Sequence, residues 1–248
     1  MTSVPDFHEL PHRCDFYFVR HGESESNADG RIQGHTDSPL SALGLEHAEA
    51  AGSWLAGKGI DAILTSPLSR ARQTADAITR HTGIARPPEV VRELIELDTG
   101  IYSGERLQDL RSIDPDLYRS FRVHSWEAVP EAERISSLER RASIVWSRLI
   151  ELASSGSRAI VCVSHGGMIQ WLIKATMAGD GHRWMPLFKV SNCGIFRFQA
   201  ESTLREAAHE GVAAHGGEAA REGGAAPEPG TGYYGTWVEM NLVPYEPR

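Results

Sequence analysis

Two histidines in this chain stand in matched surroundings that suit phosphate chemistry. His21 follows Arg20 and a short apolar run, and Gly22 comes directly after it. His165 ends a second apolar run and is followed by Gly166. A planar guanidinium matches two phosphate oxygens, and a glycine lets backbone amides come close to an anion. The pattern therefore indicates a phosphate-binding site with two histidines.

The two apolar runs, residues 16–20 and 159–164, are predicted to be buried strands of a parallel sheet. Ligands of open α/β sheets bind beyond the carboxyl ends of the strands. If these two strands are neighbours, both histidines face one pocket. A helix that begins at Gly166 would direct its N-terminal amides toward the same region.

The rest of the chain alternates between helical and strand-like patterns. Further strands are expected at 62–64, 90–91, 194–198 and 236–243. Helices are expected after Ser41 to about residue 58, at 68–78 and at 138–152. This alternation predicts an α/β fold, with one three-layer domain and a mostly parallel sheet that carries helices on both faces.

Composition narrows the class of protein. The chain has 248 residues, of which 41% are hydrophobic, and this suits one compact domain. Its formal net charge of -8 argues against a nucleic acid or an acidic membrane as a partner. The three cysteines lack metal-type spacing, and the first residues do not resemble a signal peptide. We expect a cytoplasmic protein that acts on a small molecule. The oligomeric state stays open, and a homo-oligomer is one option.

The predicted domain covers residues 15–248. One segment before it and two segments within it are expected to differ from its core. Residues 1–14 are expected to form a flexible N-terminal arm. Residues 104–136 have an irregular, mainly helical pattern and are expected to cover the pocket as a lid. Residues 203–231 consist mostly of Ala, Glu and Gly, and this composition predicts a disordered loop because it cannot bury a core.

Five blocks in a fixed order carry a resemblance to a known family. The first is R-H-G-x-S-x-x-N at 20–27, followed by Gln33-Gly34 with Asp37, Leu40 and Gly44. The others are S-x-L-x-R-A-x-x-T-A at 66–75, L-x-E-x-x-x-G-x-x-x-G at 94–104, and Ser-His-Gly-Gly at 164–167. In these blocks the chain resembles the histidine phosphatase superfamily, in its phosphoglycerate-mutase-like branch.

The resemblance implies roles position by position. His21 is the implied nucleophile, which would form a phosphohistidine, and Glu96 is the implied proton donor to the leaving oxygen. Arg20, Arg70 and His165 form the implied phosphate pocket, with His165 counted among the catalytic residues. Neither a metal nor a cofactor is implied. Further positions expected to bind substrate are Ser24, Asn27, Gln33 and Gly166.

The chemistry of these residue types agrees with the implied roles. Phosphoryl transfer depends mainly on positioning and on neutralising the phosphate oxygens. Two nearby arginines should disfavour protonation of His21, and a hydrogen bond to its other ring nitrogen would fix the tautomer. Glu93, three residues before Glu96, is the competing acid, but the glycine spacing favours Glu96. Phe121 and Trp126 are expected to pack in the core, with pocket lining as the alternative.

We expect a phosphatase that hydrolyses a small-molecule phosphomonoester. The alternative within the family is a phosphoglycerate mutase, which needs a lid with extra basic residues; the arginines of 104–136 are instead spread among aspartates. A phospho-ligand-binding module without turnover would be expected to have lost the nucleophile or the acid. A metal site on His21, His165 and Glu96 is disfavoured, because the arginines would repel a cation.

Overall fold

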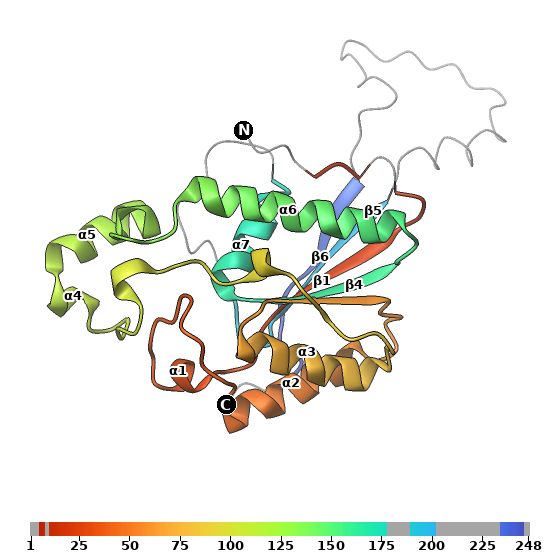
Figure 1. Ribbon diagram of the computed structural model, residues 1–248, viewed down its shortest axis with the longest axis horizontal. Helices are drawn as coiled ribbons and strands as arrows, with labels where there is room; N and C mark the ends of the chain where they lie inside the picture. Colours follow the sequence, from red (N-terminus) through yellow and green to blue (C-terminus); the bar gives the residue numbers. More distant parts are fainter. Residues whose placement is uncertain (1–4, 8–9, 178–188, 202–233, 246–248) are drawn as a thin grey trace, which may run out of the picture.

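The computed structural model describes residues 5–7, 10–177, 189–201 and 234–245. The predicted loop at 203–231 lies outside these residues. The described strands form one sheet in the order β3-β2-β4-β1-β5-β6 (Figure 1). Their bounds are β1 Cys14–Arg20, β2 Ala62–Thr65, β3 Glu89–Val90, β4 Ala159–Ser164, β5 Ile195–Glu201 and β6 Tyr234–Leu242.

The pairing of β1 with β4 determines where the two histidines lie. β1 runs parallel to β4, and β4 and β3 both run parallel to β2. β5 runs antiparallel to β1 and to β6, so the predicted mostly parallel sheet is confirmed with one reversed strand. In the β1–β4 register Arg20 stands opposite Ser164, and the chain leaves both strands at the same level.

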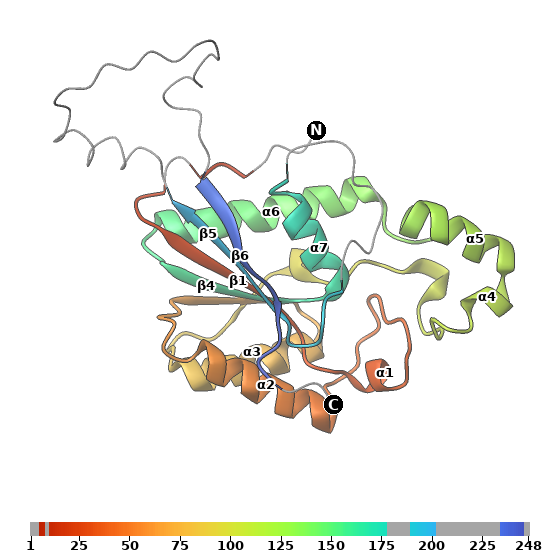
Figure 2. The same ribbon diagram turned by 180° about the vertical axis from the view of Figure 1, so that it is seen from behind.

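Helices cover both faces of the sheet, as predicted. Figures 1 and 2 show α2 (Ala42–Leu55) and α3 (Ser69–Thr82) on one face, and α6 (Ile135–Ser154) and α7 (Gly166–Lys174) on the other. Side chains alternate between the two layers. Phe16 and Phe18 pack in the cluster that includes α6 and α7, whereas Tyr17 and Val19 pack in the cluster that includes α3.

Local sequence explains how these helices begin and end. The Ser41 side chain accepts a hydrogen bond from the Gly44 amide and caps α2. Gly83 adopts a left-handed conformation and ends α3. Trp146 of α6 contacts Phe16 and Phe18 by its ring edges, and its indole N–H donates to the Leu172 carbonyl at 2.9 Å. One side chain thus joins α6, α7 and β1.

Part of the expected N-terminal arm packs against the core. Phe7 and Leu10 are buried, and the Phe7 ring lies 5.6 Å from Trp146 and 5.4 Å from Phe198. The strand β1 begins at Cys14, inside the predicted arm. Burial of two large apolar side chains anchors these residues. The prolines and polar residues of this stretch predicted a flexible arm and gave no sign of this burial.

The segment 104–136 extends to one side of the sheet, at the left of Figure 1. A small apolar cluster joins it to the residues just before it, and the buried members of this cluster are Tyr102, Leu110, Val129 and Ala132. Asp114 caps α5, and Pro115 begins it. The remaining short elements are α1 Glu25–Ala28, η1 Arg92–Leu94, η2 Gly100–Tyr102, α4 Leu110–Ile113, α5 Pro115–His124 and η3 Ser125–Ala128.

Candidate active site

The two strand-end histidines meet at one edge of the sheet. The His21 amide donates to the Ser164 carbonyl at 2.9 Å, which continues the β1–β4 pairing by one residue. The ring centroids of His21 and His165 are 5.0 Å apart. The expectation that both histidines approach one site is therefore correct, and the register of two parallel strands is its cause.

The His21 ring is buried, and its surroundings select one neutral form. Its Nδ1 lies 2.6 Å from the Gly22 carbonyl, which can only accept, so Nδ1 carries the proton. Its Nε2 then keeps a lone pair, which accepts a hydrogen bond from the Nε–H of Arg70 at 3.3 Å. Burial lowers the pKa of His21 well below its usual value, and the charges of Arg20 and Arg70 lower it further.

Close glycine packing holds the loop that carries His21. The Gly22 amide donates to the Thr74 hydroxyl at 3.0 Å. A Cβ on Gly22 would lie 2.4 Å from the Gly44 carbonyl oxygen, and a Cβ on Gly44 would lie only 1.9 Å from the Glu23 oxygen. Only glycines permit this approach of two backbones, so the start of α2 fixes the position of the histidine loop.

Arg70, on the first turn of α3, is buried beside His21. Its Nη1 and Nη2 donate to the carbonyls of Thr36 and Gly34 at 2.9 and 3.1 Å. Burial lowers its pKa, and Glu96 opposes that shift. Because an arginine side chain stays protonated in proteins, Arg70 provides a fixed positive charge at the base of the site.

Arg20 provides a second guanidinium at the same end. Its Nη1 donates to the Val190 carbonyl at 2.6 Å. Its buried Nε has no hydrogen-bond partner among the described residues. Gly166 lies beside it, since a Cβ there would be 3.7 Å from the Arg20 Nε. This unpaired donor is available to an anion in the pocket.

His165 lies next to His21 but is not among the residues that line the pocket. Its Nε2 is 2.7 Å from the Ser66 hydroxyl, and its buried Nδ1 has no partner in the described part of the chain. Its pKa is well below the usual value because it is buried, and His21, Arg70 and Arg20 add to the effect. A neutral His165 can donate to a ligand through one ring nitrogen only.

Glu96 lies against the N-terminus of α7. Its Oε1 accepts from the amides of Leu97 and Met168 at 2.9 and 3.1 Å, and its Oε2 accepts from Gly167 at 3.3 Å. A Cβ on Gly167 would lie 2.6 Å from Oε1, so a glycine is needed there. Oε2, with one long contact, is the less engaged of the two oxygens.

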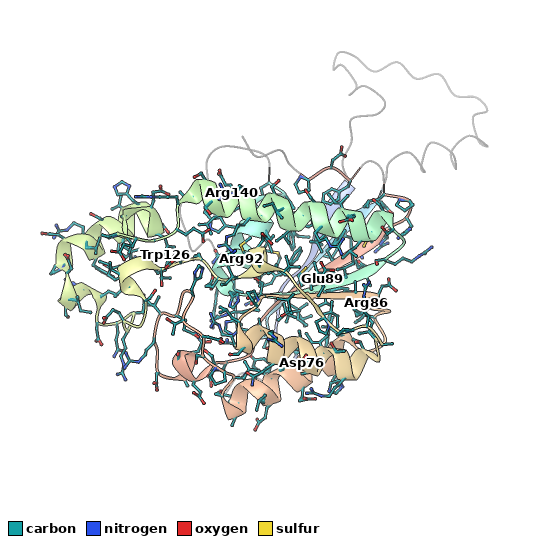
Figure 3. The ribbon with its side chains drawn as sticks, in the orientation of Figure 1. Asp76, Arg86, Glu89, Arg92, Trp126 and Arg140 are labelled. Atoms are coloured by element: carbon teal, nitrogen blue, oxygen red, sulfur yellow. The ribbon has the colours of Figure 1, made fainter. Side chains whose placement is uncertain are left out.

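The competing carboxylate, Glu93, lies elsewhere. It lines a second pocket with Arg92 of η1 and Arg140 of α6, both of which are labelled in Figure 3. In this second pocket, Arg141 forms a bidentate ion pair with Glu133 and donates to the Glu93 and Ile95 carbonyls at 3.0 and 2.7 Å. This network holds the segment that carries Glu96 against α6.

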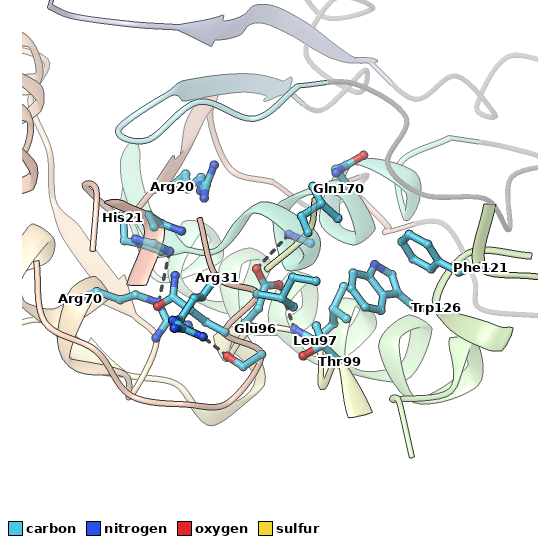
Figure 4. A pocket seen from close by; sticks show the side chains of 16 residues that line it. Arg20, His21, Arg31, Arg70, Glu96, Leu97, Thr99, Phe121, Trp126 and Gln170 are labelled. Atoms are coloured by element: carbon cyan, nitrogen blue, oxygen red, sulfur yellow. Dashed lines mark hydrogen bonds between the residues drawn. The ribbon is translucent and has the colours of Figure 1, made fainter. Parts of the chain in front are cut away.

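One pocket of about 310 Å³ is lined by His21, Arg20, Arg70 and Glu96 together (Figure 4). Of the predicted substrate-binding residues, Arg20, Arg70, Asn27 and Gln33 lie on its wall, whereas Gly166 is not among the lining residues. Ser24 does not, because its buried hydroxyl caps α1 and donates to Gln33 Oε1 at 3.0 Å. The pocket is lined by Arg20, His21, Asn27, Arg31, Ile32, Gln33, Gly34, Arg70, Glu96, Leu97, Thr99, Leu107, Phe121, Trp126, Gly167 and Gln170.

Several residues of the site did not stand out in the sequence. Asn192 donates to the His21 carbonyl and to Asn27 Oδ1, both at 3.2 Å, and so supports the histidine loop from beside β5. Arg31 lines the pocket although no motif contains it. Phe121 and Trp126 line it as well and also pack against the buried apolar clusters, so both interpretations of these two aromatics hold.

No group of three or more His, Cys, Asp and Glu side chains among the described residues could hold a metal ion. No helix in the described ranges is long and apolar enough to cross a membrane.

Comparison with known proteins relates this site to one superfamily. The profile described as "Histidine phosphatase superfamily (branch 1)" matches residues 16–209. A probable phosphoglycerate mutase GpmB of Yersinia pestis (strain Pestoides F) is 31% identical over 183 residues, which are 73% of this chain and 82% of the relative.

Two solved structures share the fold. A putative alpha-ribazole-5'-P phosphatase from Escherichia coli str. K-12 substr. MG1655 has a TM-score of 0.64 and 27% identity, over 75% of this chain and 90% of that one. A mycobacterial glucosyl-3-phosphoglycerate phosphatase has a TM-score of 0.66 and 25% identity, over 76% and 91% of the two chains.

The lowered histidine pKa values predict how stability depends on pH. His21 and His165 stay neutral in the folded protein but bind protons in the unfolded chain below about pH 6.5. The unfolded state then binds more protons, so stability is lost as the pH falls through this range, with a slope that rises toward a limit of roughly 1 kcal/mol per pH unit for each histidine. Urea unfolding between pH 7 and 5.5 measures this slope.

The matched variants are His21→Asn and His81→Asn. The first should remove the contribution of one histidine, roughly 1 kcal/mol per pH unit at the acid end of this range. The second, at an exposed histidine paired with Glu49, should retain most of the slope. An unchanged slope in His21→Asn would show that His21 is already protonated in the folded protein.

Proposed function

The chain belongs to branch 1 of the histidine phosphatase superfamily, and from that premise we propose that it hydrolyses a small phosphate monoester through a phosphohistidine on His21. One observation carries the proposal: the buried His21 ring donates from Nδ1 to Gly22 and keeps the Nε2 lone pair beside two arginines. A neutral nitrogen close to bound positive charge is what an attack on a phosphate dianion requires.

In the first step the phosphoryl group binds between Arg20 and Arg70. The unpaired Nε–H of Arg20 and the N–H groups of Arg70 neutralise charge on its non-bridging oxygens. The His21 Nε2 lone pair forms a bond to phosphorus while the bond from phosphorus to the ester oxygen breaks. Glu96 transfers a proton to that oxygen, and the alcohol leaves.

In the second step a water molecule attacks the phosphohistidine. The Glu96 carboxylate takes one proton from the water, whose oxygen bonds to phosphorus as the P–N bond breaks. His21 returns to the neutral form with its Nδ1 proton still directed at Gly22, and phosphate is released. His165, 5.0 Å from His21 between ring centroids, donates to the phosphoryl oxygens through its remaining ring nitrogen.

Two features support hydrolysis over the mutase reaction. A mutase must exclude water from the phosphoenzyme and bind the carboxylate of its substrate. The arginines of segment 104–136 are not among the pocket-lining residues, and Arg31 is the one lining cation besides Arg20 and Arg70 within the described residues. The presence of both His21 and Glu96 supports turnover over phosphate binding alone.

The first test is turnover without metal. EDTA-treated protein should release inorganic phosphate from p-nitrophenyl phosphate and from alkyl phosphates, and vanadate should inhibit it. His21→Ala should lower kcat by about 1,000-fold or more, because the nucleophile is lost. The control His81→Ala changes a histidine outside the pocket and should retain activity. Conversion of 3-phosphoglycerate to 2-phosphoglycerate without phosphate release would instead establish the mutase.

The second test concerns the proton donor. Glu96→Gln should slow alkyl phosphates by about 100- to 10,000-fold, because an alkoxide needs a proton to leave. Loss on p-nitrophenyl phosphate should be much smaller, since p-nitrophenolate is a stable leaving group. The matched control is Glu93→Gln, which changes a carboxylate outside this pocket. Equal losses on both ester types in Glu96→Gln would rule out the acid role.

A further inference from the structure

The pocket wall opposite the histidine and arginines is mainly apolar, with Thr99 and Gln170 as uncharged polar members. In Figure 4 Trp126 and Phe121 lie at the far end from His21 and Arg70, with Glu96 between the two ends. Leu97 and Leu107 also line the pocket. Because Glu96 would protonate the leaving oxygen, a group attached to that oxygen extends from Glu96 toward this wall. The inference rests on the proposed function in this respect.

The aromatic wall is firmly supported by its neighbours. The Phe121 and Trp126 rings lie 4.9 Å apart at an angle of 60°. Tyr102, which is buried, meets Phe121 edge to face at 5.9 Å. Trp126 packs against the central core as well as the small cluster of segment 104–136. Both side chains are only partly buried, so apolar surface stays available to a ligand.

Charge at this end is scarce. Besides Arg20 and Arg70, the only lining cation among the described residues is Arg31, which Figure 4 labels between Arg70 and Glu96 and which already donates to the Gly104 carbonyl at 2.8 Å. Its Nε also lies 4.0 Å from an Asp29 carboxylate oxygen, and its side chain is 45% exposed. A solvated arginine with an acidic neighbour offers little to a distal carboxylate.

We propose that the substrate class is phosphate monoesters of alcohols that carry an uncharged aromatic or bulky aliphatic group, which packs on Trp126 and Phe121. A pocket of about 310 Å³ is at the small end of the usual range for ligand sites. It suits a phosphoryl group with one ring or a branched chain of similar size.

Binding of phosphonates tests this preference without any turnover. The probes are 3-phenylpropylphosphonate and propylphosphonate, whose dissociation constants are measured by calorimetry. Burial of one ring should make the phenyl compound bind about 10- to 100-fold more tightly. A third probe, 3-phosphonopropanoate, carries a carboxylate and should bind no more tightly than propylphosphonate. Equal affinity for the first two probes, or clear preference for the third, would overturn the proposal.

Variants then assign the preference to the wall. Phe121→Ala and Trp126→Ala should each reduce the affinity ratio of phenylpropyl to propyl phosphonate by about 5-fold or more. Tyr118→Ala removes a ring that packs on Phe121 at 6.5 Å but does not line the pocket, and it should retain the wild-type ratio. If the aromatic variants do not fold, Leu107→Lys provides the test, because Leu107 is 58% exposed and its replacement should not disturb folding. This variant should also lower the affinity ratio. If Leu107→Lys and every folded aromatic variant retain the wild-type affinity ratio, the wall does not bind the apolar group.

Turnover separates this inference from the proposed function. If 3-phenylpropyl phosphate and propyl phosphate are both hydrolysed at equal kcat/KM, the proposed apolar preference is wrong and the proposed phosphatase activity is supported. If neither ester is hydrolysed but phenylpropylphosphonate binds much more tightly than propylphosphonate, the apolar subsite is supported and the proposed phosphatase activity is wrong.

Discussion

The hydrogen bond from His21 Nδ1 to the Gly22 carbonyl is the interaction on which the site depends. It places the proton of a buried imidazole on the ring nitrogen that faces away from Arg70 and leaves Nε2 with its lone pair. Burial and two arginines keep the ring neutral. The bond exists only because the loop after β1 packs without side chains on the start of α2, where Gly22 and Gly44 approach each other.

The fold supplies the other groups through separate supports. α3 provides Arg70, whose guanidinium is held by the carbonyls of residues 34 and 36. The N-terminus of α7 receives Glu96, and Arg141 of α6 holds the segment before it. Elements from both faces of the sheet thus converge at one edge. Under our proposal, no reacting group has to move far during the reaction, because each is fixed by contacts within its own layer.

Much of this arrangement is readable from the sequence, for physical reasons. Apolar runs between turn signals located β1 and β4, and the family blocks brought His21, Arg70 and Glu96 together. Other features depend on tertiary contacts that leave no local pattern. The burial of Phe7, the support from Asn192 and the position of Arg31 belong to this group. Ser24 shows that a family block can also mislead. It lies in the R-H-G-x-S-x-x-N block and was expected to bind substrate, but its hydroxyl caps helix α1.

The central claim is that Nε2 of His21 forms the bond to phosphorus, and identification of the phosphorylated nitrogen tests it most directly. The protein is mixed with a phosphate ester, quenched in alkali, digested and examined by mass spectrometry and by ³¹P NMR against the two phosphohistidine isomers. The account predicts phosphate on His21, at Nε2, because Nδ1 is engaged with the Gly22 carbonyl. Phosphate on Nδ1 of His21, or on His165 in place of His21, would contradict it.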